Sequence, residues 1–278
     1  MNLVGSQYAL GQSGDEYARL VRQAELLEPM TRRLLEDAGV ASGMRVLDLG
    51  SGTGDLCMLV AGVVGARGSV VGVDIDGNVI KFARERVYSA GFNNIEFAHC
   101  DSSQYLPLTP FDAIVGRSVL MYQPDPSKTL AKAARHLRAD GVVAFMEPWM
   151  MPPQGPDSPM KRVASCILET LHRSGAHTDL GPRLHRVFTA AGLPQPKMRF
   201  EGLIDGRDES PLYQHCADTM ASLLPKAIEH GVVSPGEIDV EDVPARLRSA
   251  MNAIGYAVSG MAMVLAWCRL ARSGPSKC

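Results

Sequence analysis

Residues 46–55 read Val-Leu-Asp-Leu-Gly-Ser-Gly-Thr-Gly-Asp, and this segment restricts the fold more than any other part of the chain. A short apolar strand leads into glycines at alternate positions, Gly50, Gly52 and Gly54, and helix-like periodicity follows from Leu56. Glycines let the backbone turn sharply and let a ligand lie against bare main chain. The segment is therefore typical of a nucleotide-binding loop. Its G-x-G-x-G spacing differs from the G-x-G-x-x-G of dinucleotide folds, which makes dinucleotide binding the second choice.

Acidic residues flank this loop in sequence and follow the next predicted strand. Asp48 stands two positions before the first glycine, and the β-branched run 69–73 ends at Asp74. A carboxylate at the tip of the second strand can accept hydrogen bonds from both ribose hydroxyls of a nucleoside over the first loop. Ile75 follows and is expected to cover one face of the base.

A third signal comes after the strand-like segment 95–98. Asp101 can accept a hydrogen bond from an exocyclic amino group, and the backbone N–H of Ser102 can donate to a ring nitrogen. Each of these features has an ordinary structural interpretation when taken alone, such as a tight turn or a helix cap. Their order and separation favour a nucleoside site.

Strand-like and helix-like patterns alternate from residue 44 to residue 147, which predicts parallel strands joined by helical crossovers. We expect strands over 44–49, 69–74, 94–98, 111–116 and 141–147, and helices over 54–64, 77–90 and 126–138. Ligands of such sheets bind at the carboxyl ends of the strands. Five residues of the sequence fall at those ends: Gly50, Asp74, Asp101, Arg117 and Glu147.

The flanking regions are helical in pattern. Residues 14–39 carry helical periodicity, and Pro29 is expected to begin a second helix there. After Glu147 a proline-rich loop precedes helices at 158–174 and 181–191 and a strand at 197–204. Residues 209–253 read as two or more helices broken near 231–236, and 258–270 reads as the final strand.

The chain resembles the class I S-adenosylmethionine (SAM)-dependent methyltransferases of the small-molecule type. The resemblance rests on VLDLGxGxG at 46–54, on GVD at 72–74, on Asp101-Ser102 and on segments 111–122 and 137–148, and it covers about residues 40–150. It implies an α/β fold: a Rossmann-like seven-stranded, mostly parallel sheet with N-terminal helices and a helical lid. The seventh strand would return antiparallel between the fifth and sixth.

This resemblance divides the chain into an N-terminal helical addition (1–40), a SAM-binding core (41–208), a lid inserted before the last strand (209–256) and a final strand with a tail (257–278). The cofactor would be SAM. Tyr8 and Gln23 are expected at its methionine end. The other expected cofactor contacts are Asp48, Gly50, Gly52, Gly54, Asp74, Ile75, Asp101, Ser102 and Arg117.

Composition narrows the acceptor. The 278 residues are 46% hydrophobic and carry 28 Lys and Arg against 30 Asp and Glu, with no basic run. Nucleic-acid enzymes usually present a basic face, so a small molecule is the expected substrate and nucleic acid is not an expected partner. A membrane is not expected either, because no apolar stretch is long and clean enough to span a bilayer. The absence of a signal-peptide pattern and of C-x-x-C pairs predicts a cytoplasmic protein with free thiols, and a homodimer is left open.

Methyl transfer from SAM needs alignment, a dry pocket and, for a weak nucleophile, a base. Glu147 is the first candidate for that base, because apolar neighbours would raise its pKa, and His172 is the second. Glu147 could instead bind a substrate hydroxyl without taking a proton. Tyr122, Trp149 and Met150 are expected to line the substrate pocket. No metal is expected, since Asp125 reads as a helix cap.

The sequence thus predicts a SAM-dependent methyltransferase that acts on a small, largely apolar metabolite, with O-methylation favoured by the proposed base. One alternative keeps the fold but changes the chemistry, to a cyclisation or to methylation of carbon or nitrogen. A nicotinamide oxidoreductase is disfavoured by G-x-G-x-G and by the lack of a recognisable Tyr-x-x-x-Lys pair.

Overall fold

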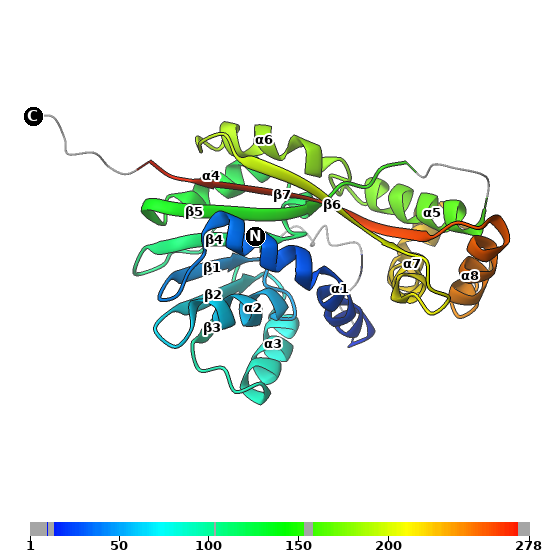
Figure 1. The fold of residues 1–278 in the computed structure, drawn as a ribbon, viewed down its shortest axis with the longest axis horizontal. Coiled ribbons are helices and arrows are strands. Elements are labelled where there is room, and N and C mark those ends of the chain that lie inside the picture. The colour runs from blue at the N-terminus through cyan, green and yellow to red at the C-terminus, as the bar shows by residue number, and fades with distance from the viewer. Residues whose placement is uncertain (1–9, 11–13, 103, 153–157, 272–278) are drawn as a thin grey trace, which may run out of the picture.

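A computed structural model describes residue 10 and residues 14–102, 104–152 and 158–271 of the chain. Its centre is a seven-stranded sheet in the order β3-β2-β1-β4-β5-β7-β6 (Figure 1). The strands are β1 (Arg45–Leu49), β2 (Ser69–Asp74), β3 (Ile95–His99), β4 (Phe111–Arg117), β5 (Leu137–Pro148), β6 (Lys197–Asp205) and β7 (Val258–Arg269). The first five are parallel, and β7 runs antiparallel between β5 and β6. The predicted fold class is therefore confirmed.

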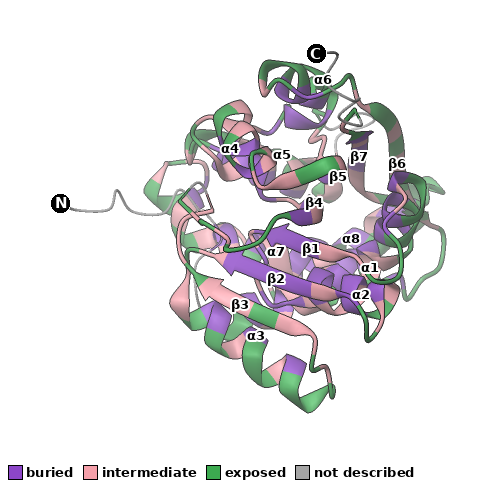
Figure 2. Cartoon of the chain, turned by 90° about the vertical axis from the view of Figure 1, so that its left-hand side faces the viewer, coloured by how far each residue is buried: buried purple, intermediate pink, exposed green. Residues whose placement is uncertain are grey.

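Burial explains why the central strands read as continuous apolar runs. β1 lies between β2 and β4, and its register pairs Leu49 with both Val73 and Gly116. Figure 2 shows these central strands buried between helical layers. Because a parallel sheet is covered on both faces, its strands do not alternate apolar and polar residues but are apolar throughout. This register also brings the carboxyl ends of β1, β2 and β4 to one edge.

Two helical layers cover the sheet. α1 (Gly14–Ala38) and α2 (Asp55–Val64) pack on one face, and α4 (Pro126–Ala134) and α6 (Leu180–Ala190) pack on the other. α3 (Gly77–Ser89) packs against β2 and β3. Asp125 caps α4 by accepting the N–H of Lys128 at 3.0 Å, as the sequence predicts.

α1 is one continuous helix, which corrects the predicted break at Pro29. Proline lacks the N–H that would bond the carbonyl four residues earlier, and it costs stability inside a helix. Here Leu27, Met30 and Leu34 around it are buried against the sheet, so tertiary packing offsets that cost. Arg33 also pairs with Glu201 of β6, which ties α1 to the sheet edge.

Three helices that pack together are called the lid below: two from the segment 209–256 and one that matches the helix predicted at 158–174. α7 (Pro211–Glu229) and α8 (Val243–Ile254) come from the expected segment, and α5 (Pro159–Arg173) packs against both of them. β6 and β7 run beyond the other strands toward these three helices (Figure 1). We call the outer part of this strand pair, residues 202–205 and 258–262, the arm.

A β-bulge separates the arm from the sheet. Glu201 pairs with Met263, but Leu203 pairs with Gly260, so β7 carries one extra residue there. Met261 lies in the bulge with φ of 35°. An extra residue reverses which side chains face each side of a strand. Beyond the bulge Val258 is fully buried, in the same apolar cluster as Val264 and the residues of α7.

Candidate cofactor and acceptor site

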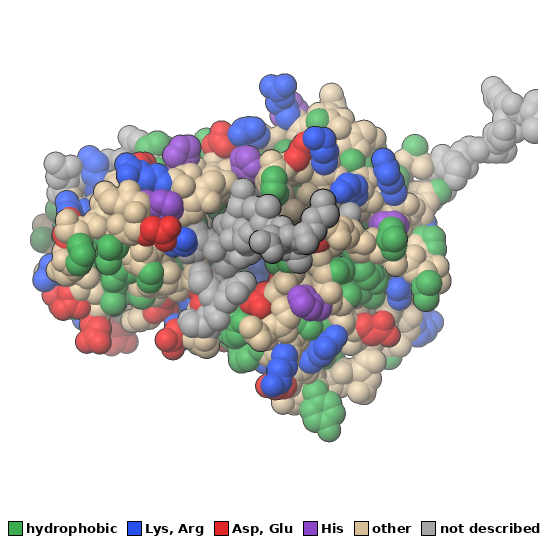
Figure 3. Space-filling view, turned by 180° about the vertical axis from the view of Figure 1, so that it is seen from behind, with side chains coloured by type: hydrophobic (Ala, Val, Ile, Leu, Met, Phe, Trp, Pro, Cys, Tyr) green, Lys and Arg blue, Asp and Glu red, His purple; other side chains and the backbone are tan. Residues whose placement is uncertain are grey.

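A cavity of about 940 Å³ lies at the carboxyl edge of the sheet, between α1, the arm and the lid. One end is formed by the glycine loop and the residues after β2 and β3. The other end is formed by residues 148–151 at the end of β5, by α5 and α7, and by the arm. The face of the molecule seen in Figure 3 mingles acidic and basic side chains. Concave, mostly apolar sites of this size bind small molecules.

The three glycines of the loop differ in what they do. All have positive φ, of 65° at Gly50, 50° at Gly52 and 84° at Gly54. A Cβ on Gly50 would lie 2.3 Å from Val119, whereas a Cβ on Gly52 would enter open space at the cavity. Gly54 does not line the cavity: it precedes α2 and packs against Phe97. Its expected contact to the cofactor is thus corrected to a role in helix packing.

Asp74 lines the cavity and binds the glycine loop. Its Oδ2 accepts the N–H of Gly52 at 2.9 Å, and its Oδ1 accepts the N–H of Asp76 at 3.0 Å. Burial raises the pKa of this carboxyl, while those hydrogen bonds oppose the shift. Ile75, which is 49% exposed, stands beside it on the cavity wall. The tip of β2 therefore offers both an acceptor and an apolar surface.

Asp48 lies beneath the loop and does not line the cavity, which corrects its expected direct contact. Its Oδ2 accepts from the Sγ of Cys57 at 3.2 Å. Its Oδ1 and the hydroxyl of Ser51 are buried without a hydrogen-bond partner among the described residues. Burial raises the pKa of Asp48 to about 7. Two oxygen atoms at the glycine loop, Asp48 Oδ1 and Ser51 Oγ, thus accept no hydrogen bond from the described residues.

Glu147 is fully buried and does not line the cavity. Its Oε1 accepts the backbone N–H groups of Val119 at 3.0 Å and of Leu120 at 2.9 Å, and its Oε2 accepts that of Met121 at 3.2 Å. Burial raises its pKa to about 7, and these hydrogen bonds oppose the rise. The carboxylate holds the turn after β4 instead of facing an acceptor. This corrects its assignment as the base.

The histidine at the cavity is His215, and the expected His172 is elsewhere. His172 is exposed in the last turn of α5 and does not line the cavity. His215 lies on α7 and contributes to the cavity wall. Burial, helped by the positive charges of Arg19 and Arg22, lowers the pKa of His215 to about 4. The sequence does not single out His215, because a lone histidine on such a helix is more often solvated than part of a site.

The end of the cavity away from the glycine loop is largely apolar. Tyr122, Trp149 and Met150 line it, as the sequence predicts, and the ring of Trp149 meets that of Phe200 edge-on at 5.4 Å. Burial raises the pKa of Tyr122, so its hydroxyl stays protonated. Further apolar lining comes from Met160, Ile167, Leu171, Leu203, Met251, Met261 and Met263.

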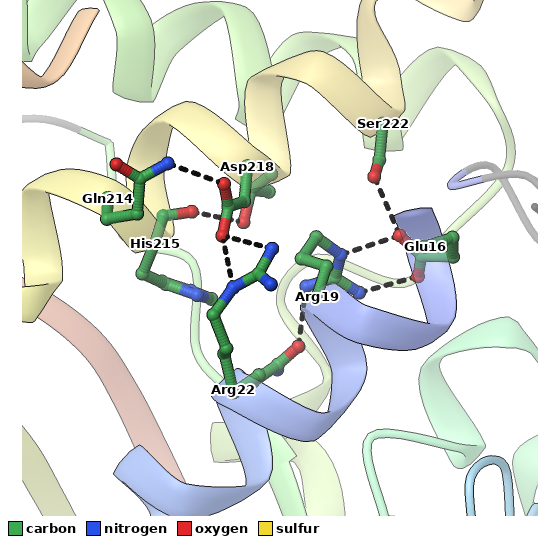
Figure 4. A network of polar contacts seen from close by, with 9 residues as sticks. Glu16, Arg19, Arg22, Gln214, His215, Asp218 and Ser222 are labelled. Atoms are coloured by element: carbon green, nitrogen blue, oxygen red, sulfur yellow. Dashed lines mark hydrogen bonds and ion pairs between the residues drawn. The ribbon is translucent and has the colours of Figure 1, made fainter. Parts of the chain in front are cut away.

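A polar network joins α1 to the lid, and sequence reasoning missed it (Figure 4). Arg19 donates to both carboxylate oxygens of Glu16 at 2.7 Å and to Gln23 Oε1 at 2.6 Å. The hydroxyl of Ser222 on α7 donates to Glu16 at 2.7 Å. Glu16 and Arg19 are buried and line the cavity. The sequence predicts a helix that contains Glu16 and Arg19. No motif in it indicates that these two side chains face the cavity.

The remaining predicted residues fall as follows. Gln23, Asp101, Ser102 and Arg117 line the cavity, and Tyr8 lies outside the described residues. Tyr17, which was not predicted, lines the cavity and donates to Asp76 Oδ2 at 3.1 Å. Within the described part of the chain no group of His, Cys, Asp and Glu is arranged to hold a metal, and no helix is long and apolar enough to cross a membrane.

Comparisons with known proteins agree with this geometry. The chain is 35% identical over 141 residues to aklanonic acid methyltransferase DauC of Streptomyces sp. strain C5, over 50% of this chain and 63% of that protein. It is 35% identical over 119 residues to the ubiquinone/menaquinone biosynthesis C-methyltransferase UbiE of Cellvibrio japonicus, over 42% and 47%. These matches span about half to two thirds of the relatives' length.

The [4+2]-cyclase SpnF shares the fold, with a TM-score of 0.52 and 18% identity over 88% of this chain and 81% of that one. A family model described as a methyltransferase domain matches residues 41–190, which is more than half of the chain. The chain therefore belongs to the methyltransferase domain family, with the fold of the class I SAM-dependent methyltransferases.

Proposed function

We propose that this protein transfers a methyl group from SAM to an oxygen of a small, largely apolar acceptor. One observation carries the proposal: a single cavity connects the glycine loop and Asp74 to the apolar chamber under the lid. The two reactants of a displacement need such a shared, dry space so that they meet in line.

The residues at the loop end fit SAM. The open space over Gly52 admits a ligand against the main chain, and Asp74 offers carboxylate oxygens to ribose hydroxyls. The hydroxyl of Ser51, which belongs to a residue of the cavity wall and has no partner among the described residues, can accept a hydrogen bond from a cationic amine. Asp101 and Ser102 stand where an adenine would lie. SAM, when bound, supplies a methyl group activated by a sulfonium.

The acceptor end provides alignment and water exclusion, and it offers little basicity. Glu147 is committed to the turn after β4, and Glu16 is paired with Arg19. An acceptor oxygen that is already acidic, such as a phenol, an enol or a carboxylic acid, needs least help in losing its proton. DauC, a relative, is named for an acid as its acceptor, which supports this choice.

C-methylation is the second candidate, because UbiE is named a C-methyltransferase. An enolate can be attacked at carbon or at oxygen, and the orientation in the chamber decides which atom reacts. The fold shared with SpnF leaves a reaction without methyl transfer as a third outcome.

The test is to incubate the purified protein with ¹³C-methyl SAM and a panel of aromatic phenols, hydroxyquinones and carboxylic acids. Carbon NMR of the products separates a methoxy carbon from a carbon-bound methyl. We expect label at oxygen. Label at carbon would favour the second candidate, and SAM binding without label in any acceptor would argue against methyl transfer.

A further inference from the structure

α7 presents His215, Cys216 and Thr219 to the cavity. The hydroxyl of Thr219 donates to the backbone carbonyl of His215 at 2.8 Å. His215 is thus the side chain of this helix that can still offer strong hydrogen bonds to a ligand in the chamber.

The imidazole of His215 has no hydrogen-bond partner among the described residues, although it is partly buried. The charged groups around it are engaged elsewhere: Arg19 with Glu16, and Arg22 with Asp218 at 2.8 Å (Figure 4). The residue is half-buried and lines the cavity, so a ligand bound there can pair with its ring. A ring that lines a cavity without a protein partner points to a partner in the cavity.

The ring is neutral at physiological pH. Burial first, and then the positive charges of Arg19 and Arg22, lower its pKa to about 4, against the opposing charge of Asp218. A neutral imidazole carries one N–H donor and one bare nitrogen acceptor. A nitrogen of such low basicity is a poor proton acceptor, so the ring is suited to orienting a hydroxyl and not to ionising it.

We propose that His215 recognises the acceptor by a hydrogen bond to its hydroxyl or carbonyl group, and so determines which apolar molecules the chamber takes. The inference rests on the proposed function, because it assumes that the apolar chamber receives the acceptor. It adds a specificity determinant on the lid, on the side of the chamber opposite the sheet.

The experiment uses two fluorescent probes that differ by one hydroxyl, 1-hydroxypyrene and pyrene, with the full chain saturated with S-adenosylhomocysteine. We expect wild-type protein to bind 1-hydroxypyrene more tightly. His215→Leu, which keeps most of the volume, should weaken binding of 1-hydroxypyrene about fivefold and leave binding of pyrene unchanged, since one neutral hydrogen bond contributes about 1 kcal/mol. His215→Gln should restore part of the loss.

His172→Leu is the matched control, because that histidine is exposed and off the cavity wall. Equal binding of 1-hydroxypyrene by wild type and His215→Leu would overturn the inference. The inference would also be overturned if His215→Leu and His215→Gln both lost binding of 1-hydroxypyrene and of pyrene while still binding S-adenosylhomocysteine. Wild-type protein that binds the cofactor product but neither probe would instead refute the apolar acceptor chamber of the proposed function.

Discussion

The carboxylate of Glu147 accepts the backbone N–H of Leu120 at 2.9 Å, in a site where its side chain is fully buried. Two further N–H groups, of Val119 and Met121, complete the arrangement. Val119 in turn contacts the position where a Cβ of Gly50 would lie. Glu147 therefore supports the cofactor loop through the turn after β4.

We expect Glu147→Gln to affect stability more than chemistry. The amide would place an N–H₂ group against backbone N–H groups that now have an acceptor, which costs about 1–3 kcal/mol. Urea unfolding measures the change, with Glu241→Gln at an exposed position as control. A variant as stable as wild type but without turnover would restore Glu147 as a catalytic group.

Breaking the buried ion pair of α1 should be costly. Glu16→Gln leaves Arg19 without its carboxylate partner, and removing one partner of a buried pair costs about 3–5 kcal/mol. Glu28→Gln, which breaks an exposed pair with Arg32, should cost less than about 1 kcal/mol. Thermal unfolding of both variants compares them, and similar losses would show that the pair of Glu16 and Arg19 is screened by solvent.

Stability of the ligand-free protein should depend on pH through Asp48. Burial raises its pKa from 3.8 to about 7, so the folded protein keeps a proton that the unfolded chain has lost between these values. Stability from this group is therefore present below about pH 4 and is lost as pH rises through 7. Asp48→Asn cannot titrate and should flatten this part of the pH profile of the melting temperature. An identical slope in wild type and variant would contradict the assignment.

Asp74→Ala should weaken binding of S-adenosylhomocysteine by about 1.5–3 kcal/mol, because hydrogen bonds to a charged acceptor are lost. Asp74→Asn keeps one carbonyl oxygen and should lose less. The exposed Asp179→Ala is the control, and calorimetry gives the affinities. Unchanged affinity in Asp74→Ala would show that the carboxylate only shapes the loop.

The sheet and the cofactor end could be predicted because local pattern determines them. Gly50, Gly52 and Asp74 lie in short segments whose spacing fixes both the turn and the strand ends. Alternation of strands and helices then sets the edge at which they meet. Pro29 misled the prediction because tertiary packing, which keeps α1 continuous, does not appear in local propensity.

The acceptor end could not be predicted in this way, because it depends on contacts between distant segments. His172 and His215 are equally ordinary in sequence, and only the packing of α5 against α7 decides which one meets the cavity. Glu147 stands at the correct strand end, yet its side chain turns to the backbone of 119–121. The bulge at Met261 has no signal in the sequence.

The most direct test of the account is calorimetry of SAM with wild-type protein and with Gly52→Val. Gly62→Val is the matched control, since Gly62 is exposed on α2 and a Cβ there meets nothing within 4 Å. We expect SAM to bind wild type and Gly62→Val at one site, NAD to give no heat, and Gly52→Val to lose SAM. Equal SAM affinity in Gly52→Val and wild type, or no binding of SAM to wild type, would contradict the assignment of this cavity.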